Sequence, residues 1–425
     1  MKIAVLGAGI SGLSIAQMLR NNHEVTLFEI NESIGGLIKC DRVNDCLYHK
    51  VGGHVFNSKN EIVLKWFWSF FDRDNEFTKV NRNAKVYFKN KIIGYPIENH
   101  IYTFHKQLAA KIITELMILN NEKTDTIDNH SDFETFLKKS FGETLYEIYF
   151  KPYNKKIWNT DLTKVSLQWL EGKLPMPDYH EILLSNILRE EESNMVHATF
   201  FYPKYNGSQF LVDRLSNNLN IEKNFKLIKA DFTNGQITLN NDRKFDKVIY
   251  TGDVRNLPLT WERLLESNNI NTKEIRSLQS NGTSTLFCET DETDISWLYI
   301  PEEFTRAHRI IYTGNFSSTN NSGTARITCV VEFSGKLTYD EMVAEITLLP
   351  GNLTPISFNY EPNSYIIQSH NTRKIISATK NVLENHGIYL LGRFAEWEYY
   401  NMDKAVEAAF YLRDRIADVT DQNIN

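Results

Sequence analysis

Apolar residues near the start of the chain follow the pattern of alternating strands and helices. Residues 2–6 are almost all apolar, which is typical of a short strand buried on both faces. Residues 13–20 follow a helix-like pattern, and residues 24–29 form a second strand-like run. Two later runs, 247–252 and 388–393, are also strand-like. The order of strand, helix and strand at the start of the chain predicts a βαβ unit.

The middle of the chain is mainly helical in pattern. Ile112 and Leu116 fall on the apolar face of one predicted amphipathic helix. The run Ser131-Asp-Phe-Glu134 is a capping box that predicts the start of another helix, which Gly142 can end. We therefore expect a helical domain over residues 100–195.

Beyond residue 198 the pattern becomes strand-like. Asn234-Gly235 lies between two apolar runs and predicts a β-hairpin. Several strand runs lie within residues 283–350, and a final helix is predicted from Met402 to about Asp418. Because no repeat or low-complexity linker separates these parts, we expect their domains to be interleaved rather than consecutive.

Composition and charge exclude several classes of protein. Hydrophobic residues make up 42 % of the chain, charged residues 24 %, and the net charge is −6, values that fit a globular protein and argue against binding to nucleic acid. The four cysteines are scattered without a CxxC pair, so we expect neither a metal site nor a disulfide framework. No apolar run approaches the roughly 18 residues of a transmembrane helix, and no signal-peptide pattern is present. We expect a cytoplasmic protein without stable membrane insertion.

The first predicted strand leads directly into Gly7-Ala-Gly9-Ile-Ser-Gly12, a GxGxxG motif at a strand-to-helix turn. Its three glycines permit a tight turn, a close approach of the backbone to a pyrophosphate, and close packing of the helix on the strand. The N-terminal N–H groups of the helix favour the phosphates. Glu29 ends the second strand, where its carboxylate can accept hydrogen bonds from a ribose 2′-hydroxyl. These features predict dinucleotide binding.

A second pair of glycines, Gly35 and Gly36, follows Glu29. This arrangement resembles the extended fingerprint of FAD-binding, amine-oxidase-like flavoproteins, so we expect FAD rather than a nicotinamide cofactor. The predicted fold is α/β, with a Rossmann-like FAD-binding domain, an inserted helical domain and an antiparallel β-sheet domain. The expected ranges are 1–60, 198–255 and 355–425 for the FAD-binding domain, 100–195 for the helical domain, and 61–99 with 256–354 for the sheet domain.

Four later segments occur in the same order as in one family of flavoenzymes. They are Lys50-Val-Gly-Gly-His54-Val-Phe56, Lys151-Pro-Tyr153-Asn-Lys-Lys-Ile-Trp158, Phe304-Thr-Arg306 and Gly392-Arg393-Phe-Ala-Glu-Trp-Glu-Tyr399-Tyr400-Asn-Met402. Together they resemble UDP-galactopyranose mutase over nearly the whole chain. The resemblance implies a homodimer that uses reduced FAD to interconvert the pyranose and furanose forms of an NDP-sugar, UDP-galactopyranose or a related NDP-hexose. It also implies a covalent adduct between flavin N5 and the anomeric carbon, and a furanose (galactofuranose) donor for polysaccharide biosynthesis.

The resemblance assigns roles to individual residues. Arg306 and Arg393 are expected to bind the diphosphate, with Arg309 as the alternative to Arg306, and His54 to lie beside flavin N5. Residues expected to bind the cofactor are Gly7, Gly9, Ser11, Gly12, Glu29, Gly35, Gly36, Gly53, His54, Gly392, Arg393, Asn401 and Met402. Residues expected to bind the substrate are Tyr153, Trp158, Arg306, Tyr365 and Tyr399, with Tyr365 in a loop.

The chain departs from the family pattern at two points. Bacterial members carry an arginine in the mobile segment where this chain has Lys173-Leu-Pro-Met-Pro177, and Lys173 and Lys204 are candidates to replace it. Asn401 stands where the bacterial pattern usually has aspartate. The nucleotide and the sugar therefore stay open.

Two other functions are compatible with a flavin-binding fold. One is an FAD-dependent oxidoreductase of the amine oxidase or protoporphyrinogen oxidase type, which has no need of diphosphate-binding arginines. The other is a non-catalytic nucleotide-sugar-binding homologue that has lost the basic residue of the mobile segment. The arginines predicted near Tyr399 favour the mutase over the oxidoreductase. A non-catalytic homologue would bind NDP-sugars without turnover even when its flavin is reduced.

Overall fold

The computed structural model describes residues 1–121, 132–167, 178–189, 199–233, 235–240 and 242–422. Its first structural part is a five-stranded parallel sheet. In spatial order its strands are β19 (Ile388–Leu390), β13 (Lys247–Tyr250), β1 (Lys2–Leu6), β2 (Glu24–Phe28) and β9 (Asn220–Glu222). The strand-like runs at 2–6, 24–29, 247–252 and 388–393 are thus confirmed, and they form one sheet although they lie far apart in the chain.

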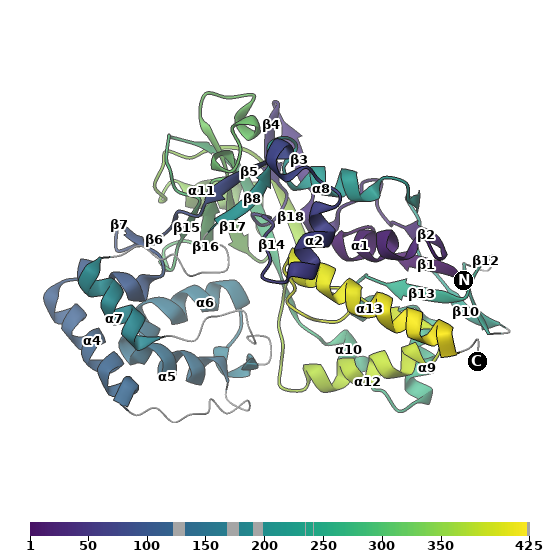
Figure 1. Cartoon of the computed structure of the whole chain (residues 1–425). Coiled ribbons are helices and arrows are strands. Elements are labelled where there is room, and N and C mark those ends of the chain that lie inside the picture. The colour runs from purple at the N-terminus through teal and green to yellow at the C-terminus, as the bar shows by residue number, and fades with distance from the viewer. Residues whose placement is uncertain (122–131, 168–177, 190–198, 234, 241, 423–425) are drawn as a thin grey trace.

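Helices cover both faces of this sheet, which explains why its strands are apolar on both sides. One face packs against α1 (Ile10–Leu19), α2 (Glu61–Trp68), α8 (Gly207–Ser216) and α13 (Met402–Gln422). The other packs against α9 (Leu259–Ser267), α10 (Thr272–Arg276), α12 (Thr372–Glu384) and a small sheet of β10 (Ala230–Thr233), β11 (Gln236–Leu239) and β12 (Arg243–Phe245). Figure 1 shows α13 in yellow, running from the centre of the molecule along the Rossmann-like domain. The pairing of β10 with β11 confirms the predicted hairpin.

The second part is a seven-stranded sheet in the upper middle of Figure 1. In spatial order its strands are β18 (Thr354–Ile366), β14 (Ser280–Thr290), β17 (Ile327–Ser334), β16 (Ala307–Ile311), β15 (Trp297–Tyr299), β6 (Ala84–Phe88) and β7 (Lys91–Gly94). All neighbours are antiparallel except β15 and β6, which are parallel. Helix α11 (Tyr339–Ile346) contributes Met342 and Ile346 to the core on one side. The expected antiparallel sheet domain is therefore present.

Two short strand pairs lie between these parts. They are β3 (Cys40–Val43) with β4 (Cys46–His49), and β5 (Phe77–Asn81) with β8 (Thr199–Pro203). The short helix α3 (Arg73–Glu76) precedes β5.

The third part is helical and lies at the lower left of Figure 1. It contains α4 (Lys106–Asn121), α5 (Phe133–Leu145), α6 (Lys151–Trp158) and α7 (Tyr179–Leu188). Ile112 and Leu116 are buried, as predicted for the apolar face of α4. The cap of α5 differs from the prediction, because Asp132 accepts the N–H of Thr135, while Ser131 lies outside the described residues. Gly142, with φ of +82°, kinks α5 rather than ending it.

The predicted domain boundaries differ from the structure at three places. Residues 61–76 pack through α2 and α3 near the Rossmann-like domain, with Val63 and Phe67 in its core rather than in the sheet domain. Residues 259–276 form α9 and α10, which pack in the same domain beside α12. Residues 354–366 form β18, which joins the seven-stranded sheet. An apolar pattern predicts that a segment is buried, but it does not say against which sheet it packs.

Candidate active site

A large cavity lies at the carboxyl ends of β1, β2 and β13, where parallel sheets bind dinucleotides. Its volume is about 900 Å³. Seven of the residues predicted to bind the cofactor line it, namely Gly7, Gly9, Ser11, Glu29, Gly35, Gly36 and Arg393. The predicted nucleotide end of the site is therefore assembled around one cavity.

The GxGxxG turn has the shape that a pyrophosphate needs. A Cβ on Gly12 would lie 1.9 Å from the carbonyl oxygen of Gly7, so only glycine lets α1 pack this closely on the turn. A Cβ on Gly9 would meet only the Cα of Gly36, at 3.8 Å. The backbone at Gly9 is therefore open toward the cavity that it lines, and the residues fit a dinucleotide.

Glu29 is buried at the end of β2, and its carboxylate fixes the GxGxxG turn. Its Oε2 accepts the N–H of Ala8 at 2.9 Å, and its Oε1 accepts the N–H of Asn31 at 3.0 Å. The carboxylate is thus held in place at the wall of the cavity. This is the position that the sequence predicts for a ribose contact.

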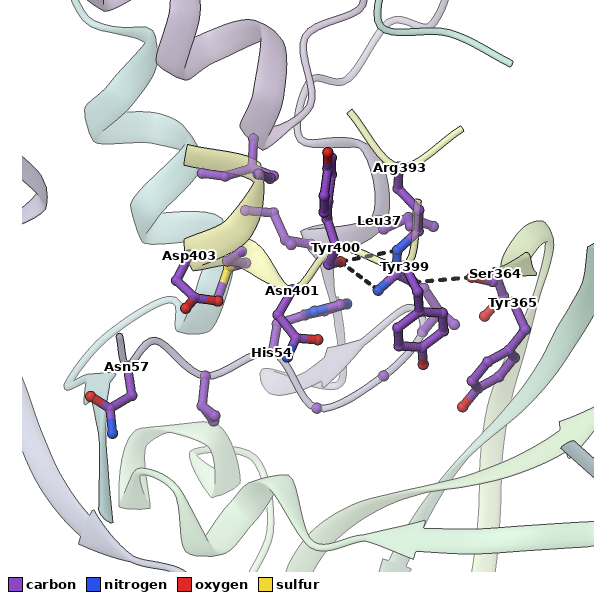
Figure 2. Close-up of a pocket in the computed structure, with 18 of the residues that line it drawn as sticks. Leu37, His54, Asn57, Ser364, Tyr365, Arg393, Tyr399, Tyr400, Asn401 and Asp403 are labelled. Atoms are coloured by element: carbon purple, nitrogen blue, oxygen red, sulfur yellow. Dashed lines mark hydrogen bonds between the residues drawn. The ribbon is translucent and has the colours of Figure 1, made fainter. Parts of the chain in front are cut away.

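A second cavity, of about 260 Å³, continues from the first, and both are lined by Ser11, Val51 and Arg393. It lies where the loop at residues 51–57, the seven-stranded sheet and the start of α13 meet. The predicted site residues on its wall are Ser11, Gly53, His54, Tyr365, Arg393, Tyr399, Asn401 and Met402, together with the alternative residue Arg309. Figure 2 shows Tyr365 and Tyr399 at one end of this cavity, and Asn57 and Asp403 at the other.

Arg393 lies between the two cavities and is held by the backbone. Its Nε and Nη2 donate to the carbonyl oxygen of Tyr400 at 3.1 and 2.6 Å, and its Nη1 donates to that of Ser364 at 3.0 Å (Figure 2). Its guanidinium carbon lies 4.4 Å from the ring centroid of Tyr399. Because a guanidinium has five N–H groups, Arg393 can offer two to a ligand while the other three fix the turn before α13.

Gly392 allows Arg393 to reach this place. Its φ is +101°, and a Cβ there would lie 2.7 Å from the Oγ of Ser11. Any other residue would push this turn away from the start of α1. Gly392 therefore acts in the cofactor site by permitting a close approach of two loops.

His54 lies on the wall of the smaller cavity and is partly buried. Burial, together with a smaller effect of the positive charge of Arg393, lowers its pKa to about 4. Its Nε2 has no hydrogen-bond partner among the described residues. The ring is therefore neutral at pH 7, and His54 lines the cavity.

Two histidines with a low pKa make stability depend on pH. Burial also lowers the pKa of His49, to about 3. Because both folded values lie below the ordinary value of about 6.5, the unfolded chain binds more protons as the pH falls. Their contribution is complete above about pH 6.5 and is lost toward pH 4. We expect each to lower the free energy of unfolding by about 2 kcal/mol between pH 7 and pH 5, measured by urea denaturation.

The control for this prediction is the variant His54→Gln, which removes one of the two titrating groups. It should lose about half of the effect assigned to His49 and His54. An unchanged pH dependence in this variant would contradict the assignment of His54 as a neutral histidine.

Arg309, on β16, is the second arginine of the smaller cavity. Its Nε donates to the buried carboxylate of Glu332 on β17, and its side chain is 21 % exposed. Its Nη groups make no hydrogen bond to a described residue, and they are available at the cavity. Burial alone would raise the pKa of Glu332, but Arg309 and His308 lower it below its ordinary range, so Glu332 stays ionised.

The prediction that Arg306 lines the site is wrong. Arg306 lies just before β16, with 51 % of its side chain exposed, and pairs with Glu341 and Glu345 of α11. Its alternative, Arg309, occupies the cavity instead. The Thr-Arg motif identified the right segment, but the arginine three residues later faces inward.

Aromatic side chains close one end of the smaller cavity. Tyr365 lies on β18, not in the expected loop, and its ring stacks on Tyr399 with centroids 6.1 Å apart. Trp158 packs behind both rings, with centroid distances of 6.2 Å to each. Tyr153 contacts Tyr299 edge-to-face at 5.8 Å. Neither Tyr153 nor Trp158 is among the described residues that line the cavity, so the structure does not place them in it.

Arg82 and Tyr299 are cavity residues that sequence reasoning missed. Arg82 Nη2 donates to the Tyr299 hydroxyl at 2.7 Å, and the guanidinium lies 5.2 and 5.4 Å from the rings of Tyr95 and Trp297. Neither residue lies in the four segments that carry the family resemblance. Together with Arg309 and Arg393, Arg82 makes three lining arginines against one lining carboxylate, Asp403, so the described wall favours anions.

Lys173 and Lys204 are the candidates to replace the arginine that bacterial members of the family carry. Lys173 lies outside the described residues. Lys204 follows β8, where its Nζ donates to the carbonyl oxygen of Asp74 at 3.1 Å, and it is not among the lining residues. Lys204 is therefore wrong as a replacement for the missing arginine in this arrangement.

The part of the chain that the structure describes offers no metal-binding cluster. In that part, no three His, Cys, Asp or Glu side chains are grouped closely enough to hold a metal ion. None of its helices is both long and apolar enough to cross a membrane.

Comparison with known proteins gives three kinds of match. Residues 5–73 match a family described as an NAD(P)-binding Rossmann-like domain. The chain is 23 % identical to UDP-galactopyranose mutase of Mycoplasma genitalium over 433 aligned residues, which cover 95 % of this chain and 92 % of that protein. It is 27 % identical to dTDP-fucopyranose mutase of Escherichia coli, but the alignment covers only 41 % of this chain and 46 % of that enzyme. A crystal structure of reduced UDP-galactopyranose mutase has the same fold, with a TM-score of 0.84, 21 % identity, and coverage of 98 % of this chain and 94 % of the other.

Proposed function

We propose that this chain is a member of the UDP-galactopyranose mutase family, to one member of which it is similar over 95 % of its length, and that it interconverts the pyranose and furanose forms of an NDP-sugar with reduced FAD as cofactor. The observation that supports this most is the pair of joined cavities. One suits a dinucleotide, and the other is lined by Arg82, Arg309 and Arg393. An isomerisation of an NDP-sugar by a bound flavin would use both cavities, the first for the cofactor and the second for the diphosphate and sugar.

FAD suits the two cavities taken together. Residues around the GxGxxG turn would hold the adenosine and pyrophosphate, and Gly53, His54 and the start of α13 would contact the flavin ring. Reduced FAD would supply the nucleophile that displaces the nucleoside diphosphate from the anomeric carbon. The first N–H groups of α13, near Met402, carry partial positive charge that favours an anionic ring.

Arg309 is proposed to bind the diphosphate. Its Nε is fixed by Glu332, and its terminal N–H groups lie at the cavity. Forked donors that stay charged suit a diphosphate as it gains charge on leaving. Arg393 would add its remaining donors from the other side.

His54 is proposed to contact the flavin without moving a proton. Its low pKa keeps the imidazole neutral, so it adds no further positive charge next to the arginines. A neutral ring there excludes water and can accept or donate one hydrogen bond. This role fits a reaction in which the protein mainly orients its ligands.

Tyr365 and Tyr399 are proposed to border the sugar or the diphosphate. Both line the smaller cavity, whereas Tyr153 and Trp158 contact the aromatic groups behind it. We infer that Tyr153 and Trp158 support the substrate site from the helical domain. For Tyr153 or Trp158 to contact the nucleotide, the lining aromatic residues in front of them would have to move.

An oxidase of the amine or protoporphyrinogen type is the competing function. The three lining arginines argue against an amine oxidase, because a cationic or neutral amine gains nothing from them. A porphyrinogen carries carboxylates, so for that substrate the assay of turnover decides. The test is to supply amines, amino acids and a porphyrinogen to the oxidised holoprotein in air and to measure peroxide. The proposal expects no peroxide above the rate of flavin alone, and stoichiometric peroxide from any of them would contradict it.

The sugar and the nucleotide stay open between UDP- and dTDP-linked hexoses. A furanose product would serve as a donor in polysaccharide biosynthesis. A cytoplasmic location and a homodimer, both expected from the sequence, stay predictions.

A further inference from the structure

Glu332 is a buried carboxylate that contacts two residues lining the smaller cavity, Gly52 and Arg309. It is 0 % exposed and lies on β17, between β14 and β16. A carboxylate in this position requires charged or hydrogen-bonding partners. Its Oε1 accepts the N–H of Gly52 at 2.5 Å, and its Oε2 accepts from Arg309 and lies 3.5 Å from Nε2 of His308.

A β-bulge brings two of these partners to the same carboxylate. Ala307 pairs with Phe333 and Arg309 with Glu332, so β16 carries one extra residue, His308, between them. Neighbouring side chains of a regular strand point to opposite faces, but a bulge redirects them. His308 and Arg309 therefore both contact Glu332.

The contacts of Glu332 lead to two segments of the wall of the smaller cavity. In the first, Gly52 has φ of +71° and begins the Gly53-His54 segment that lines the cavity. This segment packs tightly, since a Cβ on Gly53 would lie 2.7 Å from the Cγ2 of Ile311 on β16. In the second, Arg309 reaches the cavity wall.

His308 extends the group toward the aromatic end of the cavity. Its Nε2 lies 3.5 Å from the hydroxyl of Tyr365, and its Nδ1 lies 3.4 Å from the Oγ of Ser334. It is fully buried. One ionised group, Glu332, thus contacts Gly52, which begins the loop proposed to contact the flavin, and Arg309, which is proposed to bind the diphosphate. His308 lies between Glu332 and Tyr365.

We propose that Glu332 is a positioning residue, which fixes Arg309 and the Gly52–His54 segment relative to each other. The nucleoside diphosphate and the flavin are thereby held at the distance and orientation that the reaction requires. This inference rests on the proposed function for the nature of the ligands. The contacts of Glu332 do not depend on it.

The first test measures binding of UDP and dTDP to the oxidised holoprotein by calorimetry. Glu332→Gln and Arg309→Gln are each expected to weaken binding at least tenfold, and the double variant no further than Arg309→Gln alone, because Glu332 acts through Arg309. Additive losses would overturn the proposal. Glu289→Gln, on the neighbouring strand β14 and outside the cavity, is the control and should bind as the wild type does.

The double variant also guards against failure to fold. Glu332→Gln leaves Arg309 as a buried unpaired charge, whereas the double variant removes both charges. If the single variant does not fold, the comparison of Arg309→Gln with the double variant still decides the question. Equal affinities support the proposal, and weaker binding by the double variant overturns it.

The second test concerns the flavin-side loop. In the Arg309→Gln background, Glu332→Leu removes the acceptor for the Gly52 N–H, while Glu332→Gln keeps an acceptor oxygen. The visible circular dichroism of bound FAD should change with leucine and stay unchanged with glutamine. Identical spectra would overturn this half of the proposal. If the wild type binds neither UDP nor dTDP, and GDP measured in the same way also fails to bind, the proposed function is contradicted, and the inference is decided by this spectrum alone.

Discussion

Replacing Arg309 with glutamine is expected to lower kcat/KM for the NDP-sugar at least 100-fold while leaving the FAD spectrum intact. Arg309 offers its terminal N–H groups at the cavity, where the diphosphate would gain charge as its bond to the sugar breaks. A contact of this kind, which strengthens in the transition state, contributes roughly 3 kcal/mol, about a hundredfold in rate. Initial rates with reduced enzyme and separation of the two sugar isomers measure the effect.

Arg306→Gln is the matched control, because it removes the same charge three residues away. Arg306 pairs with Glu341 and Glu345 on the surface, where an ion pair contributes about 0–1 kcal/mol. The variant should keep kcat/KM within about threefold of the wild type. A large loss in Arg306→Gln with a small loss in Arg309→Gln would contradict the assignment of the cavity.

Replacing Gly9 with valine is expected to give a folded protein that is isolated without FAD. A Cβ at Gly9 meets only the Cα of Gly36 at 3.8 Å, so the side chain has room within the fold. Gly9 lines the larger cavity, and the added methyl groups would prevent the backbone from approaching the pyrophosphate. Flavin absorbance after purification and thermal unfolding of the apoprotein measure the two parts of this prediction.

Gly235→Ala should show the opposite pattern. Gly235 lies in the β10–β11 hairpin, with φ of +78° and nothing within 4 Å of an added Cβ. Alanine there costs about 1 kcal/mol of stability through backbone strain, and the protein should keep its flavin. A flavin-replete Gly9→Val protein would contradict the position of the pyrophosphate.

The nucleotide end of the site was predictable because its signals are local. The glycines at positions 7, 9 and 12 act within one turn, and Glu29 lies at the end of the adjacent strand. The start of α13 at Met402 was also predicted correctly. In each case the residues that matter are neighbours in sequence or on paired strands.

The diphosphate side was harder to predict, because it depends on strand register. Arg306 and Arg309 are three residues apart, and only the start of β16 and its bulge at His308 decide which one faces the cavity. Glu332 gave no signal, since a single glutamate in an apolar strand does not reveal its partner 23 residues earlier. Such contacts exist only once the strands of the sheet are paired.

The aromatic residues show a third limit. Tyr153 and Trp158 were expected at the substrate because of their motif, but the structure places Trp158 behind Tyr365 and Tyr399. A sequence predicts that an aromatic side chain is near a site more readily than it predicts which layer it occupies. The depth of a side chain depends on the packing of whole domains.

The most direct test of the central claim is the conversion of an NDP-sugar by the purified holoprotein in two redox states. A panel of UDP-, GDP- and dTDP-sugars is incubated with the holoprotein, with and without dithionite. The products are separated by anion-exchange chromatography, and their masses are measured by mass spectrometry. We predict a new isomer of unchanged mass from at least one sugar, formed only when the flavin is reduced. Failure to form an isomer from any sugar with fully reduced FAD, or equal conversion with oxidised FAD, would contradict the account.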